Sequence, residues 1–472
     1  GVIVAMILAA IDQTIVVTAM PTIGHALGQA EYLPWIITAY LLASTAVTPL
    51  YGKVSDIVGR RVTLLFAIVV FILGSVLCAM APNMVTLILA RGFQGLGGGG
   101  LMSMAQTIIA DIVSPKERSR YQVYIAGVYM LSSVAGPLLG GYFSEHWSWT
   151  MIFWINLPLG ALALAMTYSL LRRLPRHERP HKLDVLGALL MATAAVTMML
   201  ALNWGGKHFG WSSSQIIGLF AISAMLWAAF MWRLRTAPEP FIPTEILSNS
   251  VVALGTLTAM LIMGCYIGIT AFLPIYLELA YGLSASQSGI ALIPFMSGTV
   301  VGAIIAGQFM ARTVRYKIPG TVGLLFSVLG MILLSLMKVT PSLLLIEVII
   351  GGLSVGLGTV FPLTTVSIQN AVAAHQMGTA TGVMNFFRSL GGALVVAIFG
   401  AVLFAQLPSF ASMEGSGGVR LADIMARSTI HTAFRPVFAL TAGLLGLAFL
   451  LFSRMPQKPL RSSVKVADTI GE

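Results

Sequence analysis

Four ionisable side chains interrupt long apolar runs of this sequence: Asp12, Arg91, Glu278 and Arg388. Glu347 is a fifth, weaker case. A charged group at the centre of a bilayer costs about 2.5–3.5 kcal/mol on insertion scales, so such a residue has a partner or a function. These side chains are therefore the first candidates for chemistry inside a membrane.

Asp12 and Arg91 make a natural pair. Asp12 would lie about 16 Å along its helix if that helix enters the membrane near residue 1, close to mid-bilayer. A carboxylate there can load and release a proton, or it can make a structural hydrogen bond to a neighbouring helix. Arg91 keeps its charge and needs an internal acceptor. Asp12 could be neutralised by Arg91 in one state and protonated in another, and a static pair is the alternative.

Two stretches carry the same polar pattern at i, i+3 and i+7, namely Arg91, Gln94 and Gly98, and then Asn385, Arg388 and Gly392. Residues at this spacing share one helix face. Matching faces in two halves suggest the internal repeat that transporters commonly have. Chance in a glycine-rich chain is the competing explanation.

Glu278 is expected about one turn from the external end of its span. It is a candidate second protonation site or a counter-charge for a cationic substrate, and it can equally reach the interface. An apolar and aromatic cavity would suit varied ligands. Trp35, Tyr276 and Phe386 are candidates for its walls, beside Gln94, Asn385 and Arg388.

The segment from Gly52 to Arg61 joins two predicted spans by a short turn. Its polar and glycine positions are Gly52, Asp56, Gly59, Arg60 and Arg61. The glycines allow tight backbone geometry, and Asp56 can pair with a basic residue or a helix N-terminus. Such a loop could act as a conformational latch, although a plain solvated loop has the same composition.

A second glycine-rich stretch runs from Gly127 to Gly141. Gly136 and Gly140 make a small-xxx-small face that lets helices approach closely. Pro137 removes a helix hydrogen bond and bends the span. Bent, closely packed helices suit a rocking motion.

Two enzyme-like patterns carry little weight. Gly352–Gly356 matches a hydrolase nucleophile motif but lies in an apolar helix. Gly95–Gly100 lacks the Lys-Ser/Thr of a phosphate-binding loop. Cys78 and Cys265 sit in apolar runs without metal-ligand spacing. We therefore expect no enzyme, no cofactor and no metal site, with an ion gradient as the energy source.

Composition indicates the class of protein that positions these residues. The chain has 57% hydrophobic and only 9% charged residues, against roughly 25% charged residues in soluble domains. Long apolar runs predict about fourteen membrane helices. These lie near 1–22, 32–51, 62–81, 84–110, 120–143, 149–171, 184–203, 215–235, 251–281, 286–311, 318–337, 342–369, 377–405 and 431–453.

The distribution of basic residues predicts the orientation. Most of the 27 Lys and Arg residues fall in alternate loops and in the C-terminal tail. Positive loops face the cytoplasm, so both termini are expected there. This placement explains the net charge of +11 without nucleic-acid binding.

Taken together, these motifs resemble the major facilitator superfamily, and within it the fourteen-span drug:proton antiporter group (QacA/EmrB-like multidrug efflux transporters). The Gly52–Arg61 loop matches the superfamily signature between spans 2 and 3, and Leu87–Gly95 resembles its span-4 motif. The Gly127–Gly141 run is similar to the antiporter motif of span 5. Further segments that fit are Ile11–Pro21, Trp149–Pro158 and Phe361–Arg388.

The resemblance implies an all-α polytopic membrane protein with the major facilitator fold, two six-helix bundles plus two extra helices. The corresponding ranges are 1–171, 184–235 for the inserted spans, 251–454, and a cytoplasmic tail at 455–472. It implies a monomeric, proton-coupled antiporter of the cytoplasmic (inner) membrane that exports lipophilic, often cationic, drugs by alternating access.

In that group the residues matching Asp12 and Arg91 couple protonation to conformation, and the Asp56 loop stabilises the outward-facing state. This chain departs at Glu278, where the group more often has Gln. Arg312–Lys317 is a degraded copy of the Gly52–Arg61 loop without an acid. The alternative function is a dedicated proton-coupled exporter or importer of one metabolite, such as a sugar, an amino acid or a siderophore.

Overall fold

A computed structural model describes residues 1–29, 32–171, 183–206, 208–313, 315–338, 341–406 and 427–460. Within these ranges the chain is helical, and the only β-type pairing is an isolated bridge between Gly205 and Phe209. The basic loop expected between spans 6 and 7, most of the break at 406–429 and most of the C-terminal tail lie outside the described residues.

The helices of the first part of the chain are α1 (Val2–Leu27), α2 (Leu33–Val58), α3 (Arg60–Ala79), α4 (Met84–Ile112), α5 (Pro115–His146), α6 (Met151–Trp154), α7 (Asn156–Leu170), α8 (Val185–Trp204) and α9 (Ser214–Thr236). Those of the second part are α10 (Thr244–Ser248), α11 (Ser250–Tyr281), α12 (Ala285–Ala291), α13 (Ile293–Arg312), α14 (Ile318–Leu336), α15 (Leu343–Ala371), η3 (Ala374–Gln376), α16 (Met377–Gln406) and α19 (Arg427–Arg454).

Thirteen helical segments in the described ranges are long and apolar enough to cross a membrane. Three of them, Met151–Ser169, Gln287–Arg312 and Ala374–Leu403, join a short helix to its longer successor. The helix α4 is not among the thirteen, although its 29 residues match the span expected at 84–110. Its glycine and polar residues lower its mean hydropathy below that of the other long helices, which are richer in aliphatic side chains.

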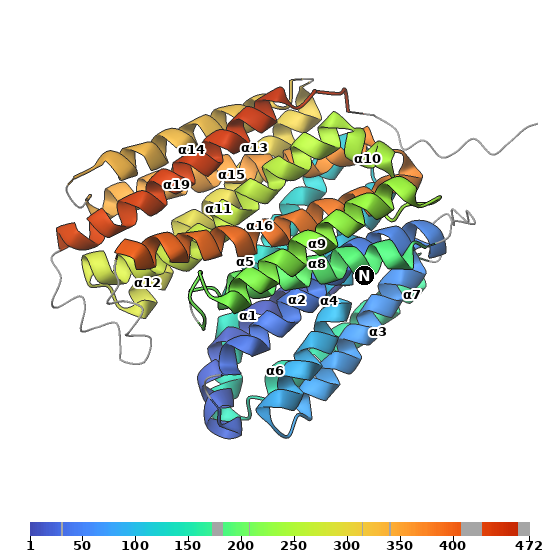
Figure 1. The fold of residues 1–472 in the computed structure, drawn as a ribbon, viewed down its shortest axis with the longest axis horizontal. Coiled ribbons are helices and arrows are strands. Elements are labelled where there is room, and N and C mark those ends of the chain that lie inside the picture. The colour runs from blue at the N-terminus through green and yellow to red at the C-terminus, as the bar shows by residue number, and fades with distance from the viewer. Residues whose placement is uncertain are drawn as a thin grey trace, which may run out of the picture.

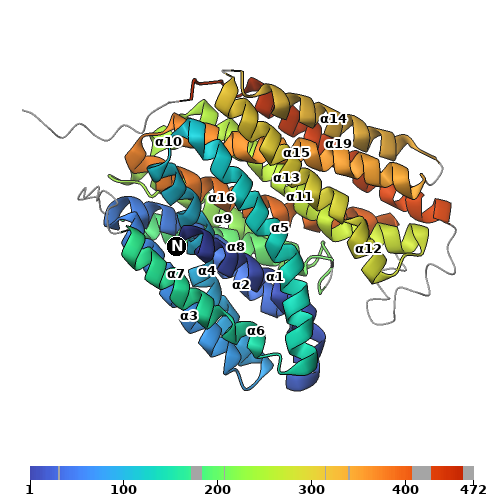
Figure 2. The same ribbon diagram turned by 180° about the vertical axis from the view of Figure 1, so that it is seen from behind.

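The helices form two groups that pack side by side (Figures 1 and 2). The N-terminal group contains α1 to α7, in which α4 contacts α2 and α3, and α5 contacts α1. The C-terminal group contains α11 to α16 and α19, in which α15 contacts α13 and α14, and α16 contacts α11. The groups meet along two seams, where α2 contacts α16 and α5 contacts α13.

The α8–α9 hairpin lies over the first of these seams, where Figure 1 shows it crossing between the groups. Its helix α8 contacts both α2 and α16. Trp204 of α8 packs edge-on against Trp35 of α2, with ring centroids 5.7 Å apart. Trp227 of α9 lies 6.2 Å from the ring of Phe386 on α16. The hairpin therefore touches both helix groups.

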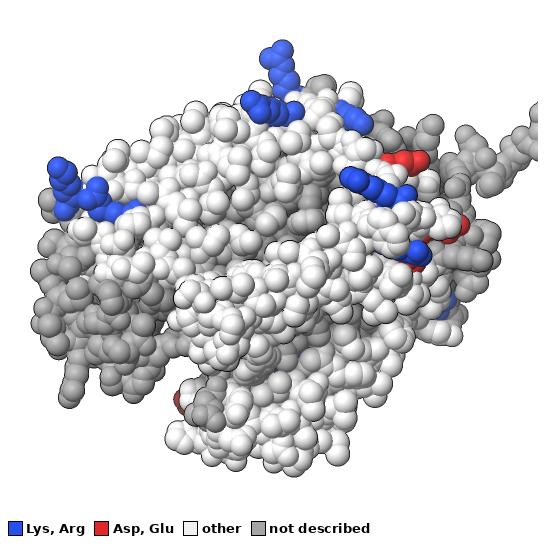
Figure 3. Space-filling model, viewed as in Figure 1, with Lys and Arg blue, Asp and Glu red and all other residues white. Residues whose placement is uncertain are grey.

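The surface agrees with a membrane location. Figure 3 shows Lys, Arg, Asp and Glu mostly near the ends of the helices, with a broad uncharged face between them. Large apolar side chains are exposed in the structure, including Phe326, Leu344 and Val348. An apolar surface of this extent is stable against lipid rather than water. The chain is a multi-pass membrane protein.

Candidate functional site

Asp12 and Arg91 form an ion pair inside the N-terminal group. Arg91 Nη1 lies 2.7 Å from Asp12 Oδ2, and the two side chains are 1% and 0% exposed. Asp12 is on α1 and Arg91 on α4, so the pair joins two helices that are distant in sequence. An ion pair this deeply buried needs further hydrogen bonds to offset the loss of hydration.

Those hydrogen bonds come from amide side chains. The other carboxylate oxygen of Asp12 accepts from Gln94 Nε2 at 2.9 Å and from Asn156 Nδ2 at 2.8 Å. The same two amides reach Ser75 Oγ of α3, at 2.7 Å and 3.1 Å respectively. Side chains from α1, α3, α4 and α7 therefore form one hydrogen-bonded network around this carboxylate.

Arg91 is held on its other sides as well. Its Nε donates to the carbonyl oxygen of Ile36 at 3.3 Å, and its guanidinium carbon lies 4.4 Å from the ring centre of Tyr40. The Tyr40 hydroxyl and Asn156 Oδ1 are buried without a hydrogen-bond partner among the described residues. The planar fork of arginine suits these divergent contacts, which a lysine could not reproduce.

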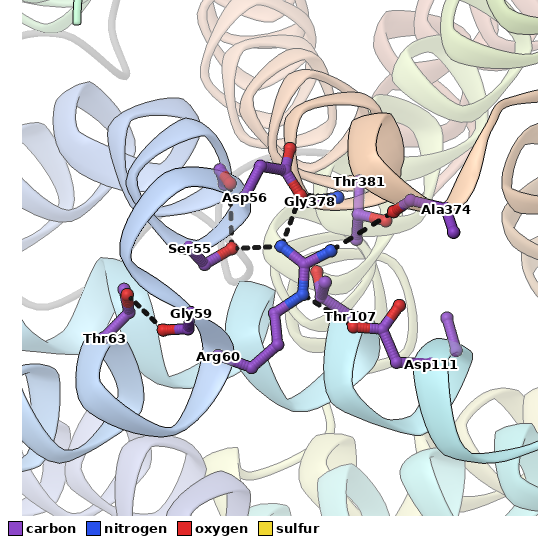
Figure 4. A network of polar contacts seen from close by, with 12 residues as sticks. Ser55, Asp56, Gly59, Arg60, Thr63, Thr107, Asp111, Ala374, Gly378 and Thr381 are labelled. Atoms are coloured by element: carbon purple, nitrogen blue, oxygen red, sulfur yellow. Dashed lines mark hydrogen bonds and ion pairs between the residues drawn. The ribbon is translucent and has the colours of Figure 1, made fainter. Parts of the chain in front are cut away.

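A second polar network joins the two helix groups at the end of the bundle where α2 ends and α16 begins (Figure 4). Asp56 accepts from the backbone amides of Gly378 and Thr379, at 3.0 Å and 2.8 Å, and from Thr379 Oγ1 at 2.7 Å. These amides lie in the first turn of α16, where backbone N–H groups have no acceptor within the helix. A carboxylate at a helix N-terminus also interacts favourably with the helix dipole.

Arg60 connects this contact to α4. Its Nη1 pairs with Asp56, and its Nε lies 2.6 Å from Asp111 Oδ2. Gly59 makes the turn between α2 and α3 with a φ of 102°, which side chains with a Cβ rarely adopt. Gly52 lies directly against Gly378 of α16. We call the contacts of Asp56 and Arg60 the latch.

Arg61 is not part of the latch. Its Nη2 donates to the carbonyl oxygen of Tyr168 on α7 at 2.9 Å, and its guanidinium lies over that ring. Among the described residues of the degraded loop, Lys317 bonds within its own group. Its Nζ bonds the carbonyl oxygens of Ser453 and Met455 at the end of α19.

The polar residues that the sequence predicts on α16 lie near the first group. Asn385 Nδ2 donates to Gln106 Oε1 of α4 at 3.1 Å, a further hydrogen bond between the groups. Arg388 Nη2 bonds Thr365 Oγ1 at 2.9 Å and the carbonyl oxygen of Phe361 at 3.2 Å, both on α15. Within the described residues Arg388 has no carboxylate partner, unlike Arg91.

The other predicted wall residues are dispersed. Tyr276 is fully buried in the C-terminal group, where its hydroxyl lies 2.8 Å from His431 Nδ1 of α19. Trp35 and Phe386 face the α8–α9 hairpin. Glu278 accepts from Ser288 Oγ at 2.9 Å. The structure brings none of these four next to Asp12.

The glycines of the α5 run have two different environments. A Cβ at Gly140 would come within 2.5 Å of the Ile15 carbonyl oxygen on α1, and Gly136 lies against Thr14. Nothing lies within 4 Å of the corresponding position at Gly127 or Gly141. Pro137 lies within α5, which continues through it. Gly136 and Gly140 thus form the close α1–α5 contact.

Several members of these networks are missed by sequence reasoning. Asn156 carries a usable signal, a single amide in an apolar run just before Pro158. Ser75 has no signal, because a serine in an apolar helix commonly bonds its own backbone. Thr379 and Gly378 act through backbone amides, which no side-chain pattern reveals.

Comparison with known proteins agrees with this architecture. The model of the Major Facilitator Superfamily matches residues 2–396. A multidrug transporter protein, MdtP, of Bacillus subtilis is 35% identical over 86% of this chain and 75% of its own length. Multidrug resistance protein 3 of the same organism is 36% identical over 89% of this chain and 82% of its own.

Solved structures show the same fold at lower identity. The human organic anion transporter MFSD10 superimposes with a TM-score of 0.65 at 16% identity, over 94% of this chain and 97% of that one. The proton:xylose symporter XylE superimposes with a TM-score of 0.62 at 14% identity, over 97% and 96%. With its helical fold and its match over most of the sequence, the chain belongs to the Major Facilitator Superfamily and is a transporter rather than an enzyme.

Proposed function

We propose that this transporter exports lipophilic drugs, cationic ones among them, in exchange for protons, and that Asp12 carries the proton. The supporting observation is the fully buried Asp12–Arg91 pair. Arginine retains its proton, so Asp12 is the member of the pair that can accept one. The names of the two Bacillus relatives, a multidrug transporter and a multidrug resistance protein, support drug export.

Protonation of Asp12 changes the energy of this arrangement directly. A neutral carboxylic acid no longer balances Arg91, and its new O–H has to find an acceptor. The unpaired Asn156 Oδ1 is one such acceptor beside the pair. Breaking a buried pair costs about 3–5 kcal/mol, enough to favour a different packing of α1 against α4. A proton thereby shifts the equilibrium between conformers.

The latch supplies the second state-dependent contact. In the orientation indicated by the basic loops, Asp56 and the start of α16 lie at the cytoplasmic face of the inner membrane. The latch then holds this side closed and must open for a substrate to enter from the cytoplasm. Alternating access would couple its opening to the protonation of Asp12.

The test uses inside-out membrane vesicles energised by respiration, with ethidium as the probe. Wild type should accumulate ethidium, an uncoupler should stop accumulation, and Asp12→Asn should abolish it. Glu278→Gln neutralises the other candidate protonation site, a membrane carboxylate that does not contact Arg91, and should keep uphill ethidium accumulation if Asp12 carries the proton. Uphill transport by Asp12→Asn would disprove the assignment of the proton carrier.

A further inference from the structure

Arg388 is a buried arginine whose positive charge is not balanced by an acidic neighbour among the described residues. It lies on α16, about 16 Å from the first residue of that helix at 1.5 Å per residue. The side chain is 9% exposed. It makes no ion pair with any residue in the part of the chain that the structure describes. A buried cation without a counter-charge is costly in a membrane protein.

The hydrogen bonds of Arg388 leave part of the guanidinium free. In the described part of the chain all three are made by Nη2, to the Phe361 carbonyl oxygen and to Thr364 Oγ1 and Thr365 Oγ1 at 3.2, 3.3 and 2.9 Å. Each of these acceptors is neutral. The Nε atom is buried and has no partner among the described residues.

No acidic side chain of the surrounding helices is placed to help. Glu278 lies about 18 Å along α11 from Tyr266, and Glu347 about 21 Å along α15 from Phe361, at 1.5 Å per residue. In the first group Asp12 is paired with Arg91, and Asp56 and Asp111 are paired with Arg60.

Aromatic side chains from both groups surround the same place. The guanidinium carbon of Arg388 lies 5.8 Å from the ring centre of Phe361. That ring meets Tyr266 of α11 edge-on, with centroids 5.8 Å apart. Tyr129 of α5 approaches Arg388 from the first group closely enough to interact electrostatically. Tyr129 leaves 42% of its surface exposed, whereas the Arg388 side chain leaves 9% exposed.

We propose that Arg388 binds the carboxylate of amphipathic substrates whose aromatic body lies against Tyr129, Tyr266 and Phe361. The proposal rests on the proposed function, since it names a substrate class for that transporter. The free Nε can donate a charge-assisted hydrogen bond to an anionic oxygen. Aromatic walls contact an apolar body without demanding one shape. The site adds carboxylate-bearing compounds to the cationic ones that the transporter would export.

The experiment measures binding to the purified full chain in neutral detergent, by the fluorescence anisotropy of three pyrene probes. Pyrenebutyrate, pyrenebutanol and (pyrenebutyl)trimethylammonium share one aromatic body and differ in charge. Wild type should bind the butyrate about tenfold more tightly than the alcohol, the size of one charge-assisted hydrogen bond. Arg388→Gln should remove that preference. Equal binding of butyrate and alcohol by wild type would overturn the proposal.

Two further variants test whether the preference depends on any cation of the group and whether Arg388→Gln loses it only by misfolding. Arg435→Gln removes a cation of the same group that bonds only a backbone carbonyl in the described contacts, and it should keep the preference. Arg388→Lys retains the charge and should keep part of the preference even if Arg388→Gln does not fold. Loss of the preference in Arg435→Gln, or its complete loss in a folded Arg388→Lys, would contradict a site made by the charge of Arg388.

A lipid phosphate has similar chemistry, so phosphatidylglycerol is added as a competitor, with phosphatidylcholine as its control. Displacement of pyrenebutyrate by phosphatidylglycerol alone would identify a lipid headgroup site and overturn the proposal. Ethidium accumulation separates this result from the general function. If wild type accumulates ethidium but shows no butyrate preference, drug export stands and the anion site is wrong. If the preference depends on Arg388 but ethidium is not moved, drug export is wrong.

Discussion

Asp56 and Thr379 are 323 residues apart in sequence, yet the Asp56 carboxylate accepts hydrogen bonds from both the backbone amide and the hydroxyl of Thr379. This contact joins the end of α2 to the start of α16 and thereby closes one end of the seam between the helix groups. Its partners are two backbone amides and a hydroxyl, so it depends on the position of α16 rather than on an opposite charge.

The first prediction concerns the strength of this latch. Asp56→Asn replaces one accepting oxygen by an NH₂ group and removes the charge, so the closed seam should lose about 1.5–3 kcal/mol. A Val383→Cys reporter, buried in the cluster that α16 shares with α2 and α8, should then react about tenfold faster with a maleimide. The reporter needs a background in which Cys78 and Cys265 are replaced by serine.

The control for the latch is Asp111→Asn. Asp111 pairs with the same Arg60 as Asp56 does but has no hydrogen bond to α16 in the described contacts. Its replacement should raise the labelling rate much less. Equal effects of the two substitutions would show that Arg60, and not the α16 N-terminus, holds the seam.

The second prediction concerns the buried pair. Asp12→Asn and Arg91→Gln should each lower the free energy of unfolding by about 3–5 kcal/mol, because each leaves an uncompensated polar or charged group in the interior. The double variant should be more stable than the sum of the single effects implies. Thermal unfolding of the purified chain in detergent, followed by tryptophan fluorescence, measures all four corners of the cycle. Strict additivity would show that the two side chains do not interact.

The third prediction separates two glycines that neighbour each other in sequence. Gly140→Ala places a methyl group against the Ile15 carbonyl oxygen, so α5 must move away from α1 at a cost of about 1–3 kcal/mol. Gly141→Ala meets nothing within 4 Å and should leave stability and ethidium transport unchanged. Comparison of melting temperature and transport in the two variants checks this. The same loss in both would indicate a backbone requirement instead of close packing.

The fourth prediction is a pH dependence at the start of α14. Burial lowers the pKa of Lys317, which lies just outside the membrane-spanning segment, from its ordinary 10.5. The folded chain therefore binds fewer protons here than the unfolded chain, so this group adds stability as pH rises through the interval between the two pKa values. Lys317→Met should flatten that part of the stability–pH curve. An unchanged slope in unfolding experiments at alkaline pH would contradict it.

The sequence alone determined the membrane class, because the length and apolarity of each run are local properties that the bilayer selects directly. It also pointed to Asp12 and Arg91, since charges inside apolar runs are visible without any structure. Their pairing in the structure follows directly, because each residue is the available counter-charge for the other at the same depth.

Tertiary structure decided which residues of different helices meet. Asn156 reaches Asp12 because α7 packs beside α1, and Ser75 of α3 joins the network through the amides of Gln94 and Asn156. These meetings depend on helix rotation and not on residue type. Tyr276 and Arg388 are equally conspicuous in the sequence. Helix packing nevertheless places Tyr276 in the core of the C-terminal group and Arg388 beside the N-terminal group. Hydrophobicity determines whether a helix is buried in lipid or protein. The direction in which each side chain points is determined only by the contacts between neighbouring helices.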